Sequence, residues 1–428
     1  MLRDLFQSRR KIVSIGLPAL ISQGTAAVWG VVTLYVARVL PSDAYAAYSV
    51  ARSVEFFAAL LGGGFVLQAL MKFAAEGSGT REKKLINSGS LLTGVLALGG
   101  ACLLLVGRGL LQGFYADLQL AGLPEILAVM VLAEAACAIP KNILLARHRT
   151  SVVMWGDLTA FALRTTVVLY LATSGRLRAP HAIFAAQAGS SLISMFVVLA
   201  MGGRFGEPQA RVSRESMREV LRFSLYTLGG SLASFVYTWT DILMLGKLSP
   251  PAQVAAYGVC RSIAAFAISL NNAANIVLLP LASRMTSQSR TGILRRTWQG
   301  IAVIMAILLP FTLVVVIFPV PILHALFGGK YDYGWPVLVT LCAVNLLRPL
   351  GSLFSATASG VGKPVFSLVS IVLSALLNVG LNALLIPRYG GMGAAVATAV
   401  SILGGGTAVV LLVTAYVRRC ESEAPQKL

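Results

Sequence analysis

Residues 34–53 read LYVARVLPSDAYAAYSVARS, and residues 243–262 read LMLGKLSPPAQVAAYGVCRS. The two stretches align without a gap at an offset of 209 residues, and the match includes proline, tyrosine and arginine in register. Two unrelated apolar helices would match by chance at leucine and alanine, but rarely at those three residue types together. The chain therefore contains an internal repeat, and Pro140 and Pro349 share the same offset.

The composition of the whole chain is that of a protein surrounded by lipid. Of the 428 residues, 57% are hydrophobic and only 12% are charged. This is about half the charged fraction of a soluble domain, so too few polar side chains remain to cover a water-exposed surface. The net charge of +19 is spread in short clusters between apolar runs. This distribution indicates membrane topology and argues against nucleic acid as a partner.

Twelve apolar runs are long enough to cross a bilayer, which takes about 20 helical residues. We predict these spans near residues 12–38, 44–72, 87–110, 120–146, 152–174, 180–202, 220–246, 253–283, 297–320, 334–360, 364–387 and 391–417. The longest polar connection, 203–219, divides the chain into a lobe of residues 1–207 and a lobe of residues 208–428. Six spans give both lobes the same topology, as in parallel-repeat transporters. The predicted fold class is therefore an all-α polytopic membrane protein with about 12 transmembrane helices in two six-helix bundles.

The basic residues predict the orientation of the chain. With the N-terminus and every second loop assigned to one side, that side holds 24 lysines and arginines against 7 on the other, and four arginines lie inside spans. Because the side richer in lysine and arginine faces the cytoplasm, we expect both termini to be cytoplasmic. The first apolar run is longer than the apolar core of a signal peptide, so we interpret it as the first span.

Several types of site have no signature in this sequence. None of the five cysteines forms a CxxC pair, and the three histidines are far apart, so we expect neither a metal site nor a disulfide framework. We find no nucleotide-binding loop and expect no cofactor. The glycine triplets at 62–64 and 404–406 lie inside spans, where close helix packing or a kink is the simplest interpretation. The first triplet could also act as a hinge.

Further stretches carry a family resemblance. Residues 378–401 read NVGLNALLIPRYGGMGAAVATAVS, residues 325–338 read ALFGGKYDYGWPVL, and residues 358–364 read ASGVGKP. Together with residues 37–53 and 240–262, they occur over nearly the whole chain. In this order and spacing they resemble the Wzx-type polysaccharide flippases of the multidrug/oligosaccharidyl-lipid/polysaccharide (MOP) exporter superfamily. No single motif among them is decisive.

The resemblance implies a function and a set of partners. Wzx-type members flip oligosaccharides linked to undecaprenyl diphosphate across the bacterial cytoplasmic (inner) membrane, and so supply surface polysaccharide assembly. The implied partners are this lipid-linked substrate, the lipid bilayer and polysaccharide polymerase machinery. The fourteen-span lipid II flippases fit the twelve predicted spans less well. The identity of the glycan, the oligomeric state and the driving force, whether protons, sodium ions or the membrane potential, stay open.

Two other functions stay open at this point. A MATE-like multidrug/cation antiporter of the same fold should have an acidic cavity, whereas the intramembrane charges here lean basic. A membrane glycosyltransferase or polysaccharide ligase needs a sizeable outer loop and catalytic carboxylates or histidines, whereas the outer loops of this chain are short. We therefore expect a transporter and not an enzyme.

Charged residues inside spans are the candidate site residues, because a charge at the bilayer centre costs about 2.5–3.5 kcal/mol and so faces a partner or a wet cavity. We expect all four arginines to contact substrate, namely Arg52, Arg164, Arg261 and Arg348; the acids are Glu55, Glu134, Asp157 and Asp241. Arg52 and Glu55 could pair at i and i+3, and Asp157 and Arg164 share a helix face. The amides of Asn272 and Asn275 suit either sugar hydroxyls or helix–helix hydrogen bonds.

The repeat relates Arg52 to Arg261, and each has a tyrosine four residues earlier, Tyr48 and Tyr257. At ~1.5 Å per residue, Arg52 lies about 12 Å along its span, near the middle of a hydrocarbon core of about 30 Å. We predict that the two guanidinium groups face each other and clamp the diphosphate, since arginine binds phosphate bidentately and stays charged. The tyrosines could orient the arginines or stack on a sugar. In the alternative interpretation, each arginine only ties its own bundle together.

The acids do not follow the repeat. Asp241 corresponds to Val32, and Glu55 corresponds to Ala264. An asymmetric titratable acid could bind a proton or a sodium ion and bias one state of the transport cycle. We assign this ion-coupling role first to Asp241 and second to Glu55, and a structural ion pair is an equal alternative for either.

Overall fold

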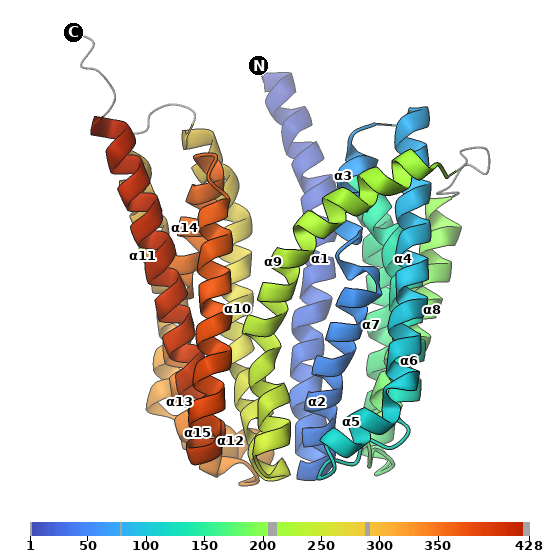
Figure 1. The fold of residues 1–428 in the computed structure, drawn as a ribbon, viewed down its shortest axis with the longest axis vertical. Coiled ribbons are helices and arrows are strands. Elements are labelled where there is room, and N and C mark those ends of the chain that lie inside the picture. Colours follow the sequence, from blue (N-terminus) through green and yellow to red (C-terminus); the bar gives the residue numbers. More distant parts are fainter. Residues whose placement is uncertain (1, 78, 204–211, 287–291, 423–428) are drawn as a thin grey trace. The chain divides into compact units, whose positions relative to one another are not determined.

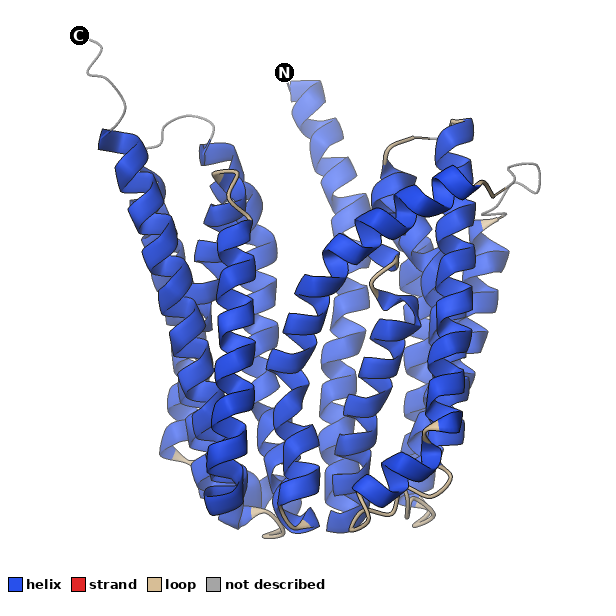
Figure 2. Ribbon diagram, viewed as in Figure 1, coloured by secondary structure: helices blue, strands red, loops and turns tan. Residues whose placement is uncertain are grey.

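The structure is a computed structural model that describes residues 2–77, 79–203, 212–286 and 292–422. All regular elements in these ranges are helices, and no strand is present among them (Figure 2). This confirms the predicted all-α class. Helices suit lipid because each one satisfies its backbone hydrogen bonds internally.

The chain forms two compact units, Met1–Leu232 (unit 1) and Ala233–Leu428 (unit 2). Unit 1 contains eight α-helices and one π-helical turn (Figure 1): α1 (Leu2–Val39), α2 (Ser42–Ala59), η1 (Leu60–Gly64), α3 (Leu67–Ala75), α4 (Thr80–Val106), α5 (Arg108–Phe114), α6 (Leu123–Ala146), α7 (Thr150–Thr173) and α8 (His181–Gly202). Unit 2 contains α10 (Pro251–Thr286), α11 (Ile293–Ile317), α12 (Pro319–Phe327), η3 (Asp332–Gly334), α13 (Trp335–Asn345), α14 (Arg348–Gly360) and α15 (Val365–Ser422).

The boundary between the units falls inside α9 (Arg214–Leu248), not in the polar connection 203–219 where the sequence places the division. The beginning of α9 belongs to unit 1 because its apolar face packs there. Val220 is fully buried in a cluster with Phe73, and the ring centroids of Phe73 and Phe223 lie 6.0 Å apart. Apolar packing, rather than chain polarity, therefore sets the extent of unit 1.

Nine of the described helices are long and apolar enough to cross a membrane, and the number is ten when the bent pair Ser42–Gly64 and Leu67–Ala75 is counted as one broken span. Two differences separate this set from the twelve predicted spans. The long helix α15 contains the last two predicted spans in one element. The other difference is α9, which covers the predicted seventh span but is not in the set, since serines, threonines and Asp241 interrupt its apolar run.

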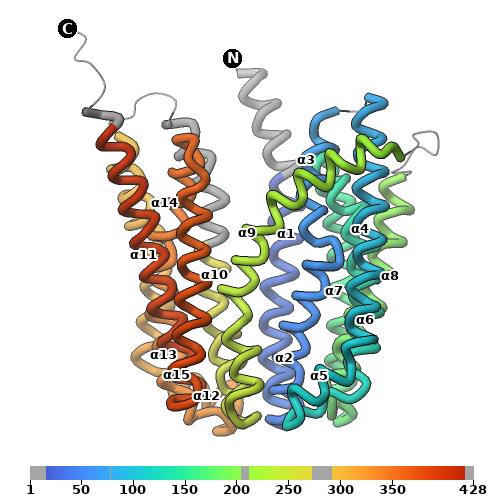
Figure 3. The backbone as a smooth tube through the Cα atoms, viewed as in Figure 1, coloured from blue at the N-terminus to red at the C-terminus, as the bar shows by residue number. Residues whose placement is uncertain are grey.

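The 58 residues of α15 form a helical hairpin. Gly390 has a non-helical backbone (φ 52°, ψ −130°), and the trace reverses between its orange and red parts (Figure 3). The Ser370 hydroxyl donates to the Gly405 carbonyl at 2.7 Å, and the Ser374 hydroxyl donates to the Ser401 carbonyl at 3.1 Å. From Ser370 to Ser374 the first arm advances by four residues, while the contacted residue of the second arm moves back by four, from Gly405 to Ser401. The two arms are therefore antiparallel.

The two glycine triplets have packing roles. A Cβ atom on Gly405 would lie 1.8 Å from the Ser374 hydroxyl of the opposite arm, so this glycine permits the close approach of the hairpin arms. Gly63 has a φ of +100°, and an added Cβ would lie 3.0 Å from backbone and side-chain atoms of Thr93. At this point the axes of the segments Ser42–Gly64 and Leu67–Ala75 differ by 42°. The predictions of close packing and of a kink are confirmed.

Candidate functional site

Unit 2 contains a buried polar cluster around Asp241. Asp241 is 4% exposed, and its carboxylate accepts a short hydrogen bond from the Tyr257 hydroxyl. Nη1 of Arg261 lies 3.3 Å from Oδ1 of the same carboxylate, and the Arg261 guanidinium carbon lies 4.3 Å from the centre of the Trp239 ring. Asp241 and Trp239 lie on α9, whereas Tyr257 and Arg261 lie one turn apart on α10. Tyr257 and Arg261, which the repeat singled out, therefore both contact Asp241 of the neighbouring helix α9.

The cluster continues into α15 through residues that sequence analysis did not select. The Thr398 side chain lies beside the Tyr257 hydroxyl and acts on it electrostatically. The Asn378 amide donates to the Thr398 hydroxyl at 3.4 Å, and the Asn382 amide donates to Oδ1 of Asn378 at 2.9 Å. Asn378 and Asn382 are fully buried, and Oδ1 of Asn382 has no hydrogen-bond partner in the described part of the chain. Their spacing of four residues on one helix face is the signal that could have identified them.

Arg348 occupies a second position in unit 2, at the start of α14. Its Nε donates to Oδ1 of Asn345 at 2.6 Å, and the Asn345 amide in turn donates to the Ala264 carbonyl at 3.2 Å. The Arg348 guanidinium carbon lies 5.5 Å from the centre of the Tyr237 ring. Arg348 is thus held by an amide and an aromatic ring.

In unit 1, Arg52 pairs with Glu55 on its own helix, as the i and i+3 spacing predicts. Nη1 of Arg52 and Oε2 of Glu55 lie 2.8 Å apart, and the Glu55 side chain is only 2% exposed. Glu134 on α6 also interacts with the Glu55 carboxyl group, and Glu134 accepts a 2.7 Å hydrogen bond from the Gln187 amide on α8. Arg52 and Glu55 therefore belong to a charged network that links α2, α6 and α8.

Tyr48 differs from its repeat counterpart. Its ring stacks on Phe184 with centroids 5.4 Å apart and lies 5.7 Å from the Tyr45 ring. Tyr257 instead donates to an acid. The repeat thus preserves the tyrosine but not its contact, because unit 1 has Val32 where unit 2 has Asp241.

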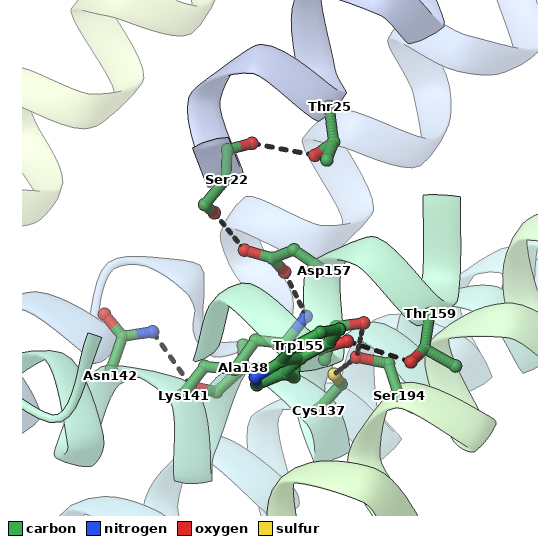
Figure 4. Close-up of polar contacts among 11 residues, drawn as sticks. Ser22, Thr25, Cys137, Ala138, Lys141, Asn142, Trp155, Asp157, Thr159 and Ser194 are labelled. Atoms are coloured by element: carbon green, nitrogen blue, oxygen red, sulfur yellow. Dashed lines mark hydrogen bonds and ion pairs between the residues drawn. The ribbon is translucent and has the colours of Figure 1, made fainter. Parts of the chain in front are cut away.

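A second polar network of unit 1 joins α1, α6 and α7 (Figure 4). Nζ of Lys141 lies 2.6 Å from Oδ1 of Asp157, and the Ser22 hydroxyl donates a short hydrogen bond to the other oxygen of the same carboxylate. Lys141 lies inside α6, within the predicted span 120–146, and forms an intramembrane ion pair. Close by, the Ser194 hydroxyl donates to the Gly156 carbonyl at 2.8 Å and Cys137 contacts the Ser194 hydroxyl.

Arg164 lies two helical turns beyond Asp157 on α7. Its guanidinium carbon is 4.5 Å from the centre of the Trp29 ring of α1. The shared face of Asp157 and Arg164 is therefore the face that meets α1. The side chains of Asn272 and Asn275 lie outside the described residues, so their predicted contact with substrate stays a prediction. That the guanidinium groups of Arg52 and Arg261 face each other also stays a prediction, because Arg52 belongs to unit 1 and Arg261 to unit 2.

Comparison with known proteins gives the family. The sequence profile of the family described as "Polysaccharide biosynthesis protein" matches residues 8–286, and the MatE profile matches residues 227–384. The chain is 25% identical over 214 residues to the probable low-salt glycan biosynthesis flippase Agl15 of Haloferax volcanii, a match that covers 50% of this chain and 45% of Agl15. It is 24% identical over 395 residues to the probable flippase AglR of the same organism, covering 90% of this chain and 79% of AglR.

The match with an uncharacterized membrane protein of Methanocaldococcus jannaschii, MJ1068, is 24% identical over 207 residues, and covers 47% of this chain and 40% of that protein. The chain thus matches less than half the length of Agl15 and of MJ1068.

Solved structures share the fold at low sequence identity. The inward closed structure of the lipid II flippase MurJ superposes with a TM-score of 0.74 at 13% identity, and covers 94% of this chain and 87% of that chain. An inward-facing MATE transporter of the MOP superfamily superposes with a TM-score of 0.67 at 16% identity, and covers 97% and 100%. The fold is that of MurJ and MATE proteins, and because the family profile matches more than half of the residues, this chain belongs to the family described as "Polysaccharide biosynthesis protein".

Proposed function

We propose that this protein is a flippase that moves a lipid-linked oligosaccharide across the cytoplasmic membrane by alternating access, for surface polysaccharide biosynthesis. The substrate we propose is an oligosaccharide repeat unit linked to undecaprenyl diphosphate. The family and the flippases among its relatives support transport of a lipid-linked glycan in preference to catalysis. The site residues then bind substrate or a coupling ion and carry out no covalent step.

The observation that carries the proposal is the environment of the intramembrane arginines. Three of them lie on aromatic rings. The distance from the guanidinium carbon to the ring centre is 4.5 Å for Arg164 on Trp29, 4.3 Å for Arg261 on Trp239 and 5.5 Å for Arg348 on Tyr237. A guanidinium that stacks through its face keeps its in-plane N–H donors for a ligand. Aromatic rings also suit sugar rings, so each unit offers the two chemistries that a diphosphate-linked glycan needs.

The charges of unit 2 favour this function over a MATE-like cation antiporter. Unit 2 holds two of the intramembrane arginines, Arg261 beside Asp241 and Arg348 beside Tyr237, but only one of the candidate acids, Asp241. A large organic cation cannot be coordinated by the Asp241 oxygens as a small ion can, so the excess positive charge would oppose its binding. A diphosphate would be favoured there for the same reason.

We propose that Asp241 couples transport to an ion. Its carboxylate is buried and accepts a hydrogen bond from Tyr257. The Tyr257 hydroxyl lies beside Thr398, which in turn accepts from the buried amide Asn378, and Asn382 donates to Asn378. Carboxylate, hydroxyl and amide oxygens are ligands that suit a hard cation, and the same carboxylate could instead take a proton. Glu55 is the second coupling residue that we propose, because it is buried beside Glu134.

The test is a flipping assay in proteoliposomes. The purified protein is reconstituted with a fluorescent oligosaccharide linked to undecaprenyl diphosphate, and a membrane-impermeant reductant reports the fraction of fluorophore in the outer leaflet. We expect the protein to make nearly all of the substrate accessible, whereas protein-free vesicles expose about half. Accumulation of an organic cation such as ethidium, without movement of the lipid-linked glycan, would support the antiporter instead. In cells, deletion should block surface polysaccharide and trap the lipid-linked repeat unit inside.

A further inference from the structure

The beginning of α9, which belongs to unit 1, has two opposite faces. One face consists of buried residues at intervals of four, namely Ser216, Val220 and Ser224. The other face carries a row of exposed arginines at the same interval, namely Arg214, Arg218 and Arg222. Residues four apart lie on one face of a helix, and at 3.6 residues per turn the arginine row lies on the side opposite to the buried row.

Contacts with unit 1 fix the rotation of this segment. Val220 is fully buried in a cluster with Phe73 of α3, and the Thr227 hydroxyl donates to the Phe65 carbonyl at 3.3 Å. On the flank of the segment, Nη2 of Arg81 lies 2.6 Å from Oε1 of Glu219. Because the segment is held on its inner face and on one flank, the arginine row points away from the helices of unit 1.

The arginine row is not neutralised by the protein. Within the residues that the structure describes, none of the three arginines has a carboxylate at ion-pair distance. Of the two acids in this segment, Glu219 is paired with Arg81, and Glu215 is exposed beside the row. The outer face of the segment therefore has an excess of positive charge.

Apolar side chains continue the same face further along the helix. Leu221 and Leu225 are 37% and 54% exposed, and each follows an arginine of the row by three residues, so they share its face. Tyr226 beside them is 73% exposed. Cations first, then leucine and tyrosine, is the order expected where a helix passes from water through the headgroups into lipid.

The direction of the segment suits the headgroup layer. At ~1.5 Å per residue, Arg214 and Arg222 lie about 12 Å apart along the helix, whereas the headgroup region on each side of the hydrocarbon core is only about 5–8 Å thick. An upright helix would carry the row out of this layer. Figure 1 shows that α9 begins obliquely across α3 and α4, which brings the three arginines closer to one depth.

We infer that the basic face of α9, which consists of Arg214, Arg218 and Arg222 with Leu221 and Leu225, binds the headgroups of anionic phospholipids. The arginine forks match phosphate oxygens, and an anionic leaflet attracts clustered basic residues at its surface. Lipid suits this face better than an acidic soluble protein does, because the leucines continue it toward the span. The ligand is ordinary phospholipid, so the inference goes beyond the proposed function and does not depend on the glycan.

The experiment measures lipid preference at this face in the full-length chain. In a background without the five native cysteines, a bimane fluorophore is attached at E215C, next to the arginine row, in every protein compared. The protein is reconstituted in vesicles of phosphatidylcholine and phosphatidylglycerol. Quenching by brominated lipid of each headgroup, measured against its mole fraction, gives the local binding constant of phosphatidylglycerol relative to phosphatidylcholine.

The variants separate local charge from net charge. The test variants are R218Q, R214Q/R218Q/R222Q, R214K/R218K/R222K and L221Q/L225Q. The matched control is R147Q/R295Q/R418Q, which removes three exposed arginines at the ends of α6, α11 and α15 and changes the net charge equally. Gel filtration and thermal unfolding report whether each variant is folded.

We expect the parent protein to prefer phosphatidylglycerol by about fivefold or more at low salt, and to lose most of this preference at high salt because exposed charges are screened. R218Q should lower the preference by up to about fivefold, the value for one basic residue near an anionic surface. The triple glutamine variant should bind both lipids equally, whereas the triple lysine variant and the matched control should keep the preference. L221Q/L225Q should weaken quenching by both lipids without changing their ratio.

Three results would overturn the inference. The first is equal binding of the two lipids by the parent protein at low salt. The second is an unchanged preference in R218Q and in the triple glutamine variant, or an equal loss in the matched control, which would show an effect of net charge alone. The third is binding of poly-L-glutamate without a preference for phosphatidylglycerol, which would assign the face to an acidic protein. Failure of the flipping assay would overturn the proposed function and leave this inference intact, since no glycan is used here.

Discussion

Arg261 and Asp241 form an ion pair between neighbouring helices, with Nη1 and Oδ1 3.3 Å apart. The repeat counterpart of Arg261 pairs differently, because Arg52 binds Glu55 on its own helix. The repeat has thus kept the arginine while the acid has changed position. An arginine that is present at the same repeat position in both units suits a role common to both, such as substrate binding. An acid whose repeat counterpart is apolar suits a step that occurs once per transport cycle.

Asp241→Asn should remove ion coupling. The amide keeps the shape of the side chain and can still accept from Tyr257, so we expect the protein to fold and to flip substrate at the rate that the wild type shows without an ion gradient. Flipping in proteoliposomes with imposed proton or sodium gradients is the measurement. D117N is the control, since Asp117 is exposed. A variant that still responds to either gradient as the wild type does would exclude the coupling role.

Removal of Arg52 and Arg261 should abolish export. Each single alanine variant should reduce flipping by about 10- to 100-fold, because hydrogen bonds to charged groups contribute about 1.5–3 kcal/mol. Arg→Lys should reduce it less. Loss of Arg52 alone leaves the buried Glu55 unpaired, which is destabilising, so R52A/E55Q serves as the control that removes both charges. Normal export by the R52A/R261A variant, at wild-type membrane levels, would refute the substrate clamp.

Cysteine labelling should report the orientation of the chain. In a background without the five native cysteines, S249C between α9 and α10 should react with a membrane-impermeant maleimide in intact cells. S213C at the start of α9 should react only after permeabilisation, because the excess of lysine and arginine assigns its side to the cytoplasm. The reverse pattern would contradict cytoplasmic termini. Reaction of both sites from the same side of the membrane would contradict the prediction that α9 spans the membrane.

Gly63→Ala should lower thermal stability. Gly63 has a φ of +100° and an added Cβ would meet Thr93 at 3.0 Å, so backbone strain and a steric clash should together cost about 1–3 kcal/mol. Gly99→Ala is the matched control, because Gly99 lies in α4 and an added Cβ meets no atom within 4 Å. We expect G99A to be neutral or slightly stabilising. Equal unfolding midpoints for the two variants would show that the kink does not depend on glycine.

The features predicted correctly from the sequence are those with a local or a periodic cause. The all-α class follows from apolar runs longer than a bilayer requires. The Arg52–Glu55 pair follows from a spacing of three residues on one helix, and the kink at Gly63 follows from a glycine triplet inside a span. The partner of Lys141 was not predicted, since a lysine near the end of an apolar run is equally compatible with exposure at the membrane surface and with the ion pair that it forms with Asp157.

By itself the sequence determined that the chain spans a membrane, that it contains a repeat, and which charged residues lie inside its spans, because these depend on composition, length and spacing along one chain. Only the tertiary structure decided their partners: Asp241 with Tyr257 and Arg261, Asp157 with Lys141 and Ser22, and Arg164 with Trp29. These contacts join different helices, so they depend on the register and rotation of each helix against its neighbour. That register is set by the packing of many side chains at once and leaves no periodic signal in a single sequence.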